Sequence, residues 1–487
     1  MFEQGQAAEI SRLTKCLKEQ FTLIMVTTAS LPPIPSAAAD YVVPDYGTLN
    51  DELETLTQEF LGNSPPEVQE LMLNHLQQWK SSEILQEALK EGDVAPDFVL
   101  PDQDGNMISS VDLRANGPII IIFFRGNWCT FCNATLRMIR KYTPHFKARG
   151  ATVVAISPQT TERSKEIQKS AGLNFPLLSD VRSEYAQLLN IAYVLDENMQ
   201  KMIESHGTSL QEINGTNEYG VPVLPLPATY VIQSDGRVTY SYVDADFTHR
   251  AEPLDVLNAL PPLGRRRLTL QELLDIEMAK LIDTYPEHQI RLFSDAIEEA
   301  KKKGVEGSAA KVGDKAPDFR LAIEKNHGET FDSKQARCRG PLVVVFHHHS
   351  SLCRIQLDAL QRLLPKFEAK GATLVVISPK KSTESGIQFL ELQDTSEQQV
   401  AQQFGILHRL PQWDGDAKEL PIPSTFVIDS DGSIVYSFVN VDPAQRPDPM
   451  KVLEAIPPPA AHPFKRGPFS IIFGRRLAPH IKRRRQV

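Results

Sequence analysis

Apolar residues follow two spacings along the 487-residue chain, and each spacing predicts one kind of secondary structure. They recur at three- and four-residue intervals over 49–60 and 68–76, which is typical of amphipathic helices. Uninterrupted apolar runs at 119–124 and 152–156 predict buried strands instead, with a helix over 129–148 between them. The pattern therefore predicts a helical pair followed by a strand, a helix and a second, parallel strand.

Glycine and proline positions refine these elements. Gly150 lies at the end of the predicted helix, where a residue that readily adopts positive φ is favoured. Pro144 lies deep in the same helix and is expected to kink it. An Asp-Gly pair at 235–236 lies between two further apolar runs, which predicts a β-hairpin near the end of the unit.

The whole pattern occurs twice along the chain. Corresponding residues are 221 positions apart, as in the pairs Gly92 and Gly313, Pro144 and Pro365, and Cys132 and Cys353. The prolines that precede the hairpin, Pro227 and Pro423, are only 196 positions apart, so the second copy is 25 residues shorter. Most of the missing length falls within 195–219, which we interpret as a surface insertion in the first copy.

The repeat predicts an α/β chain with two tandem domains, each built on a central mixed sheet flanked by helices and preceded by a helical preface. The predicted boundaries are 1–47 for an N-terminal extension, 48–262 for the first domain with its preface at 48–91, 263–458 for the second domain with its preface at 268–311, and 459–487 for a basic tail.

Composition places the chain among ordinary globular proteins, with 41 % hydrophobic and 23 % charged residues. Its apolar runs are far shorter than the roughly 18 residues of a membrane helix, so we expect no membrane span. Five cysteines are too few for a disulfide-stapled secreted framework, which favours a reducing compartment such as the cytoplasm. The net charge is −9, and the basic tail is interpreted as a solvated segment. No basic groove with interleaved aromatic residues accompanies it, so no nucleic-acid partner is expected.

Only the first copy has two closely spaced cysteines. Cys129 and Cys132 form a CxxC motif at the start of the predicted helix, whereas the second copy has Ser350 and Cys353. Unpaired backbone N–H groups and the positive end of the helix dipole favour a thiolate at such a position. Cys132, one turn later, is placed to attack an oxidised Cys129, so the pair predicts a dithiol–disulfide cycle. Cys353 is a candidate single thiol in the second domain.

The cysteines also have non-redox interpretations. A zinc half-site would need further ligands, and the first copy has no second CxxC or HxxxH motif; inert packing is the other alternative. On a strand, His347 and His349 would point to the same side near Cys353 and could bind a metal, but we interpret this histidine run as polar filler. Cys16 is interpreted as incidental and Cys338 as a loop residue, and no metal or other cofactor is predicted.

Four segments carry a family resemblance, at 92–98, 125–132, 175–180 and 226–232. They resemble the peroxiredoxin-like branch of the alkyl hydroperoxide reductase and thiol-specific antioxidant family, across the first domain and more weakly across the second. This resemblance implies a thioredoxin-like fold in each half. It also implies that Pro227 and Pro423 are cis-prolines facing the active-site helix, an uncommon isomer.

The resemblance leaves the attacking sulfur open. Peroxiredoxins carry a Pro-x-x-x-Thr/Ser-x-x-Cys motif, and here Arg125 and Cys129 stand at the Pro and Thr/Ser positions. By analogy with thioredoxins the nucleophile is Cys129, and by analogy with peroxiredoxins it is Cys132. We favour Cys129. Arg125 and Arg250 are candidate cations that would stabilise the thiolate and polarise the departing oxygen.

These residues predict an antioxidant thiol oxidoreductase that reduces hydroperoxides through a Cys129/Cys132 cycle. An external dithiol reductant, such as a thioredoxin-type protein, would restore the pair, and the second domain would be largely structural or regulatory. Two alternatives are a thioredoxin-like protein disulfide reductase and a non-enzymatic, redox-sensing interaction module.

Overall fold

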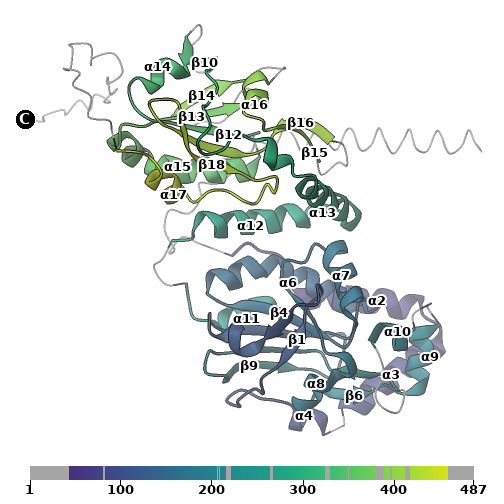
Figure 1. The fold of residues 1–487 in the computed structure, drawn as a ribbon. Coiled ribbons are helices and arrows are strands. Elements are labelled where there is room, and N and C mark those ends of the chain that lie inside the picture. Colours follow the sequence, from purple (N-terminus) through teal and green to yellow (C-terminus); the bar gives the residue numbers. More distant parts are fainter. Residues whose placement is uncertain are drawn as a thin grey trace, which may run out of the picture.

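The computed structural model describes residues 43–458, apart from 81–82, 206, 208, 215–220, 264–266, 324–328, 349, 380–387, 395–397 and 412–416. The tail at 459–487, His349 and all but the last five residues of the extension lie outside the described residues, as does Cys16. The described chain forms two α/β halves, one on each side of a long helix at the start of the second half (Figure 1).

The first half is built on a five-stranded mixed sheet with strand order β5-β4-β3-β8-β9. Its strands are β3 Ile119–Phe123, β4 Thr152–Ser157, β5 Leu177–Ser179, β8 Ala228–Ile232 and β9 Val238–Val243. Strands β3, β4 and β5 are parallel, and β8 and β9 form the predicted antiparallel hairpin. Two small sheets pair β1 Val99–Pro101 with β2 Met107–Ser109, and β6 Ala192–Val194 with β7 Val223–Pro225.

Helices cover both faces of this sheet because side chains on β3 alternate between two cores. Ile120 and Ile122 pack with the long helix that follows β3, whereas Ile121 and Phe123 pack into a second core on the opposite face. The helices are α2 Leu49–Asn63, α3 Pro66–Lys80, α4 Ile84–Glu87, α5 Ser110–Arg114, α6 Thr130–Ala148, α7 Thr161–Ser170, α8 Glu184–Leu188, α9 Glu197–Glu204, α10 Leu210–Asn214 and α11 Pro253–Asn258, with one 3₁₀ turn, η2 Val181–Ser183.

The second half repeats this core within a seven-stranded sheet of order β11-β10-β14-β13-β12-β17-β18. Its strands are β10 Arg320–Ile323, β11 Thr330–Asp332, β12 Leu342–Phe346, β13 Thr373–Ser378, β14 Leu390–Gln393, β17 Ser424–Ile428 and β18 Ile434–Val439, with a separate hairpin of β15 Leu407–Pro411 and β16 Ala417–Pro421. Its helices are α12 Leu270–Asp283, α13 Glu287–Lys302, η3 Val305–Ser308, α14 Ser333–Arg337, α15 Ser351–Ala369, α16 Gln399–Gln403 and α17 Pro449–Glu454.

The two central sheets have the same topology, since β14-β13-β12-β17-β18 follows the order and directions of β5-β4-β3-β8-β9. This confirms the predicted α/β class with two tandem thioredoxin-like domains, while their outer boundaries stay a prediction. Helix α6 runs through Pro144 as one element and ends just before Gly150, which has a φ of 79°. None of the described helices is long and apolar enough to cross a bilayer.

The interpretation of 195–219 as a surface insertion is wrong for its described part. This segment contains α9 and α10, and it buries Met199, Ile203, Leu210 and Ile213. Helix α9 has apolar residues on one side, which packs against the core beside α3 instead of facing solvent. The insertion is therefore part of the first half's core.

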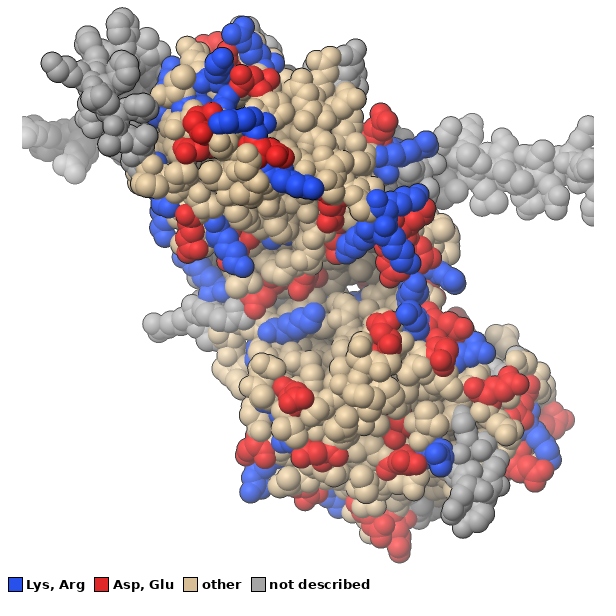
Figure 2. Space-filling view, viewed as in Figure 1, with Lys and Arg blue, Asp and Glu red and all other residues tan. Residues whose placement is uncertain are grey.

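Helix α12 joins the two halves, because it packs against both α6 and α15 (Figure 1). Asp283, at its end, forms ion pairs with the side chains of Arg140 and Lys141 on α6. Lys169 on α7 similarly pairs with Asp295 and Glu298 on α13. Charged side chains of both signs gather on the surface where the halves meet (Figure 2). The two helices that begin at the cysteine motifs thus share one packing partner.

Buried His145 on α6 predicts a specific loss of stability in acid. Its Nε2 lies 2.9 Å from the Tyr46 hydroxyl. Burial, followed by the charges of Lys280 and Arg149, lowers the pKa of His145 from 6.5 to about 4. As the pH falls, the unfolded chain therefore protonates His145 at a higher pH than the folded chain does. The stability contributed by the neutral His145 ring is complete above pH 6.5 and is lost as the pH falls toward 4.

Measured from pH 6.5 to pH 4, the fall in unfolding free energy should be about 3 kcal/mol smaller in His145→Gln than in the wild type. Denaturant titrations at several pH values would measure this difference. His288→Gln, which changes an exposed histidine on α13, should retain the wild-type profile. Parallel pH profiles for the wild type and His145→Gln would contradict the assignment.

Candidate active site

Cys129 occupies the N-cap of α6, directly after the loop that follows β3. Its Sγ accepts a hydrogen bond from the backbone N–H of Cys132 at 3.3 Å, as N-cap side chains commonly do. Gly126 lies in the loop before Cys129 and has a φ of 149°. The Trp128 indole lies only 2.5 Å from the place where a Cβ atom would stand, so a side chain at this position would clash with it. Cys129 is therefore at the cap, and not within the helix as its first residue.

Arg125 supplies a buried positive charge directly to Cys129. Its Nη2 lies 3.2 Å from the Cys129 Sγ, and the residue is only 3 % exposed. The guanidinium carbon lies 4.1 Å from the ring centroid of Phe247 and 5.1 Å from that of Trp128. Aromatic faces and a thiolate are both favourable neighbours for a guanidinium that has lost its water.

Arg250 makes the corresponding contact with Cys132. Its Nη2 lies 3.5 Å from the Cys132 Sγ, while its Nη1 donates to the backbone carbonyls of Phe247 and His249. Each cysteine therefore has its own arginine, so the structure brings together four of the residues predicted from sequence. Cys132 is fully buried and Cys129 is 3 % exposed.

The two thiols share their protons unequally. Burial and then the neighbouring thiol hold the pKa of Cys129 above its ordinary value, against the charge of Arg125. Burial also opposes ionisation of Cys132, yet the hydrogen bond with Cys129, followed by the charges of Arg250 and Arg125, lowers the pKa of Cys132 well below its usual range. The pair thus favours one negative charge held between two arginines, and a proton shared by the two sulfurs.

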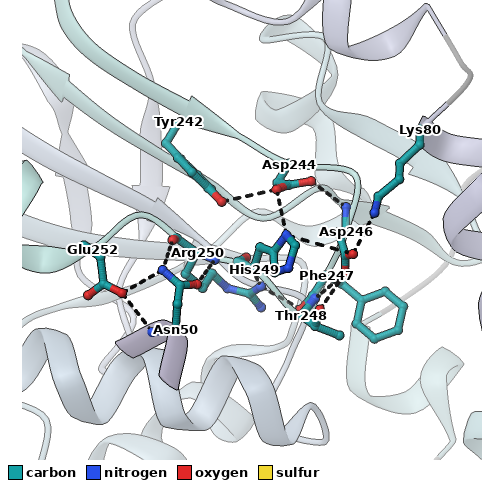
Figure 3. A network of polar contacts seen from close by, with 10 residues as sticks. All are labelled: Asn50, Lys80, Tyr242, Asp244, Asp246, Phe247, Thr248, His249, Arg250 and Glu252. Carbon is teal, nitrogen blue, oxygen red and sulfur yellow. Dashed lines mark hydrogen bonds and ion pairs between the residues drawn. The ribbon is translucent and has the colours of Figure 1, made fainter. Parts of the chain in front are cut away.

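A network of polar contacts fixes the loop that carries Phe247 and Arg250 (Figure 3). Asp246 accepts hydrogen bonds from the Thr248 N–H and hydroxyl and from Lys80. Asn50, on α2, donates to the Arg250 carbonyl at 3.0 Å and accepts from the Arg250 N–H at 3.2 Å. The helical preface therefore holds the backbone of Arg250 through both its N–H and its carbonyl group.

Glu252 completes the junction between this loop and the preface. Its carboxylate accepts hydrogen bonds from the backbone N–H groups of Leu49 and Asn50, at the start of α2. The contact with Asn50 is drawn in Figure 3. A carboxylate at a helix N-terminus is stabilised by those unpaired N–H groups. Sequence reasoning missed Asn50 and Glu252, because a contact spanning about two hundred residues has no local signature.

A cavity of about 530 Å³ opens beside Cys129. Its walls come from the site loop, from preface helices α2 and α3, from helix α9 of the insertion and from Phe247. The lining residues are Leu56, Glu59, Phe60, Asn63, Ser64, Met72, Arg125, Trp128, Cys129, Thr130, Phe131, Met199, Met202, Ile203 and Phe247. Cys129 lines this cavity and Cys132 does not, so small molecules reach the pair through Cys129.

The expectation of a cis bond before Pro227 and Pro423 is wrong, because the described chain contains no cis peptide bond. The trans isomer of an X-Pro bond is lower in energy by about 0.5–1 kcal/mol. Pro227 is buried immediately before β8, and the preceding Leu226 N–H donates to the Ile191 carbonyl. Ala228 pairs with Phe123, so Pro227 still lies at the end of the sheet that leads to Arg125.

The second half keeps only one of the two thiol–arginine pairs. Cys353 Sγ accepts a hydrogen bond from the Ser350 hydroxyl at 3.2 Å, and Arg446 Nη2 lies 3.8 Å from the same sulfur. These residues correspond to Cys132, Cys129 and Arg250. The strand pairings align Phe346 with Phe123, so His348, two residues after β12, stands in place of Arg125, two residues after β3. Burial opposes ionisation, but the charge of His348, a hydrogen bond from His347 and the charge of Arg446 lower the pKa of Cys353.

The predicted strand alternation of the histidine run is wrong, because β12 ends at Phe346. His347 and His348 follow the strand as irregular backbone, so period-two geometry does not apply to them. Among the residues that the structure describes, no group of three or more His, Cys, Asp or Glu side chains is arranged to hold a metal ion.

The fold and the paired cysteines define the first half as a thiol redox domain of thioredoxin-like architecture. The AhpC/TSA family model matches residues 92–241 and 312–437, together more than half of the chain. The chain belongs to the AhpC/TSA family, and both of its halves contribute to the match.

Individual relatives carry names of two kinds. The thiol-disulfide oxidoreductase ResA of Bacillus subtilis is 28 % identical over 153 residues, which cover 31 % of this chain and 66 % of the relative. A Mycobacterium tuberculosis protein provisionally named as a peroxiredoxin is 38 % identical over 92 residues, covering 19 % of this chain and 58 % of the relative. The crystal structure of the peroxidoxin BcpB from the same organism covers 35 % of this chain and 96 % of its own, with 21 % identity and a TM-score of 0.27.

Loss of the Arg125 charge should make the thiol pair less acidic. In Arg125→Gln, we expect the alkylation rate of Cys129 by iodoacetamide at neutral pH to fall about tenfold, because a charged hydrogen bond of roughly 1.5 kcal/mol changes the thiolate population by about that factor. Alkylation rates measured across pH, with mass mapping of the modified cysteine, would test this. Arg125→Lys retains the charge and should lose less.

Arg163→Gln is the matched control, because Arg163 lies on α7 and its charge pairs with Glu166 at the surface. Its alkylation profile should match that of the wild type. An Arg125→Gln protein that unfolds like the wild type and shows an unchanged profile would contradict a role of Arg125 in holding the thiolate.

Proposed function

We propose that this protein is a thiol peroxidase that reduces hydroperoxides through Cys129 and Cys132. The observation that supports this most strongly is the placement of Cys129 Sγ: it lies on the wall of a cavity, 3.2 Å from a buried guanidinium, and one helical turn from a second cysteine. A guanidinium at this place can stabilise a thiolate and also the negative charge that develops on a departing oxygen.

Cys129 is the proposed nucleophile because it is the cysteine that the cavity reaches. Its proton passes to the Cys132 thiolate, and the Cys129 thiolate then attacks the terminal oxygen of the hydroperoxide. The S–O bond forms as the O–O bond breaks, so the sulfur is oxidised to a sulfenic acid. The alkoxide leaves as an alcohol after taking the proton held by Cys132. Arg125 stabilises the charge throughout this step.

Cys132 carries out the second step of the catalytic cycle. Its thiolate, beside Arg250, attacks the Cys129 sulfur, so that a disulfide forms and hydroxide leaves, to be protonated by solvent. An external dithiol of the thioredoxin type then supplies two electrons and two protons, which restores both thiols. Cys129 is 3 % exposed, so a protein reductant needs the start of α6 to move before it can reach the disulfide.

We assign the second half a largely structural or regulatory role in this activity. It retains a thiol–arginine pair in Cys353 and Arg446, but Ser350 cannot form a disulfide with Cys353. Cys353 therefore remains a candidate single thiol. A cytoplasmic location likewise stays a prediction.

The cysteine variants test the proposed order of events. Cys129→Ser should abolish peroxide consumption, because it removes the attacking sulfur. Cys132→Ser should still be oxidised once, leaving a sulfenic acid on Cys129 that dimedone traps and no intramolecular disulfide. Peroxide loss with dithiothreitol as reductant, and mass mapping of the products, would measure both effects. Cys338→Ser, which changes an exposed cysteine, should behave as the wild type.

The reverse pattern, with Cys129→Ser still oxidised and Cys132→Ser inert, would overturn the assignment of the nucleophile. A protein disulfide reductase is the second candidate, favoured by the CxxC motif and by the likeness to ResA. Rapid reduction of insulin disulfides without peroxide consumption would support it. The 3 % exposure of Cys129 argues against direct attack on a protein disulfide.

A further inference from the structure

The cavity beside Cys129 is built largely from segments outside the central sheet and the cysteine helix. Leu56 and Phe60 come from α2, Met72 from α3, and Met199 and Met202 from α9. The family match begins at residue 92, so the α2 and α3 walls precede it. The second copy is 25 residues shorter, mostly in the segment that holds α9, and none of its described residues from β15 to β16 lies in a helix. Glu277 replaces Leu56 at the corresponding position. These walls are therefore particular to the first half.

The size of this cavity exceeds what hydrogen peroxide needs. A volume of about 530 Å³ lies within the range of roughly 300–1,000 Å³ that accommodates drug-sized ligands. Most of its walls are aliphatic, aromatic or methionine side chains, and methionines adapt to apolar groups of varied shape. A molecule with two oxygen atoms and no apolar part would leave most of this space unused.

The charge inside the cavity is already balanced. Arg125 is the cation among the lining residues, and its guanidinium contacts Cys129 and two aromatic rings. Glu59, exposed on α2, adds a negative charge to the lining. An anionic group on the substrate would meet this carboxylate without a free cation to pair with, so an uncharged group fits better.

Two polar atoms mark where a ligand oxygen would bind. Arg125 Nε and Trp128 Nε1 are buried and have no hydrogen-bond partner within the described part of the chain. Both residues line the cavity beside Cys129, and Arg125 is more than nine-tenths buried. Both atoms carry N–H donors, so they require an acceptor, and buried donors without one are costly. A hydroperoxide offers acceptor oxygens at the end that Cys129 attacks.

We propose that this cavity binds the uncharged apolar group of a bulky organic hydroperoxide, and that Leu56, Phe60 and Met202 determine this specificity. This inference rests on the proposed peroxidase function. The peroxide oxygens lie beside Arg125, Trp128 and Cys129, and the apolar group extends between α2 and α9. Discrimination against hydrogen peroxide comes from contacts that hydrogen peroxide lacks.

Filling the cavity tests the specificity. In Leu56→Trp, the rate constant for oxidation by cumene hydroperoxide should fall at least about tenfold, which is the scale of one or two lost apolar contacts. The rate constant for hydrogen peroxide should stay within about twofold, because that molecule does not need the filled space. Stopped-flow oxidation of the reduced full chain gives both constants. Met202→Trp fills the cavity from the opposite wall and should act likewise.

Leu73→Trp is the matched control, since Leu73 is 59 % exposed on α3 and does not line the cavity. It should leave both rate constants unchanged. If Leu56→Trp and Met202→Trp fold but lower both constants equally, or leave their ratio at the wild-type value, the proposal is overturned.

A binding measurement separates this proposal from the peroxidase function. Ligand-observed NMR with 2-phenylpropan-2-ol, the alcohol product of cumene hydroperoxide, should detect binding to the wild type and to Leu73→Trp but not to Leu56→Trp. This result supports the cavity assignment even if the protein consumes no peroxide. A lack of peroxide consumption would contradict only the proposed function. No binding to the wild type overturns the cavity assignment, whatever the peroxidase assay shows.

Discussion

The contact between the Arg125 guanidinium and the Cys129 sulfur is the interaction on which the rest of the site depends. A guanidinium that is only 3 % exposed has lost nearly all of its water, and such a charge is tolerated only where other groups replace that hydration. Here the Cys129–Cys132 pair carries the opposite charge, and Phe247 and Trp128 supply aromatic faces. The fold must therefore deliver two separate segments, 125–129 and the loop that carries Phe247, to one point.

Each of those segments is held by an element far from it in sequence. Strand β3 and the cap of α6 place Arg125 and Cys129, while the loop after β9 brings Phe247 and Arg250. That loop is in turn tied to the start of α2 through Asn50 and Glu252. The helical preface thus serves as part of the site: it fixes the backbone of Arg250 and also walls the cavity.

Local patterns were sufficient to predict much of this structure. The apolar runs predicted β3 and β4, the Asp-Gly pair predicted the β8–β9 hairpin, and Cys129 and Cys132 were correctly expected at the start of a helix. Contacts between distant segments were beyond such reasoning. Helix α9 looked like a surface insertion because its length is absent from the second copy, yet the side chain of Met199 is buried. Likewise, the paired arginines were candidates, but the assignment of one to each sulfur required the three-dimensional structure.

The second half shows why the Arg125 contact and the Cys129 sulfur depend on each other. With Ser350 in place of Cys129, a guanidinium at the position of Arg125 would lose the sulfur that Arg125 contacts, and a buried charge without its partner is costly. His348 stands there instead, and burial lowers its pKa, so this ring can be neutral where a guanidinium cannot. Cys353 keeps Arg446 because that arginine reaches the sulfur from the other loop. Loss of one thiol therefore removes the need for one cation and leaves the other pair intact, which is the pattern expected if each arginine is present for its own sulfur.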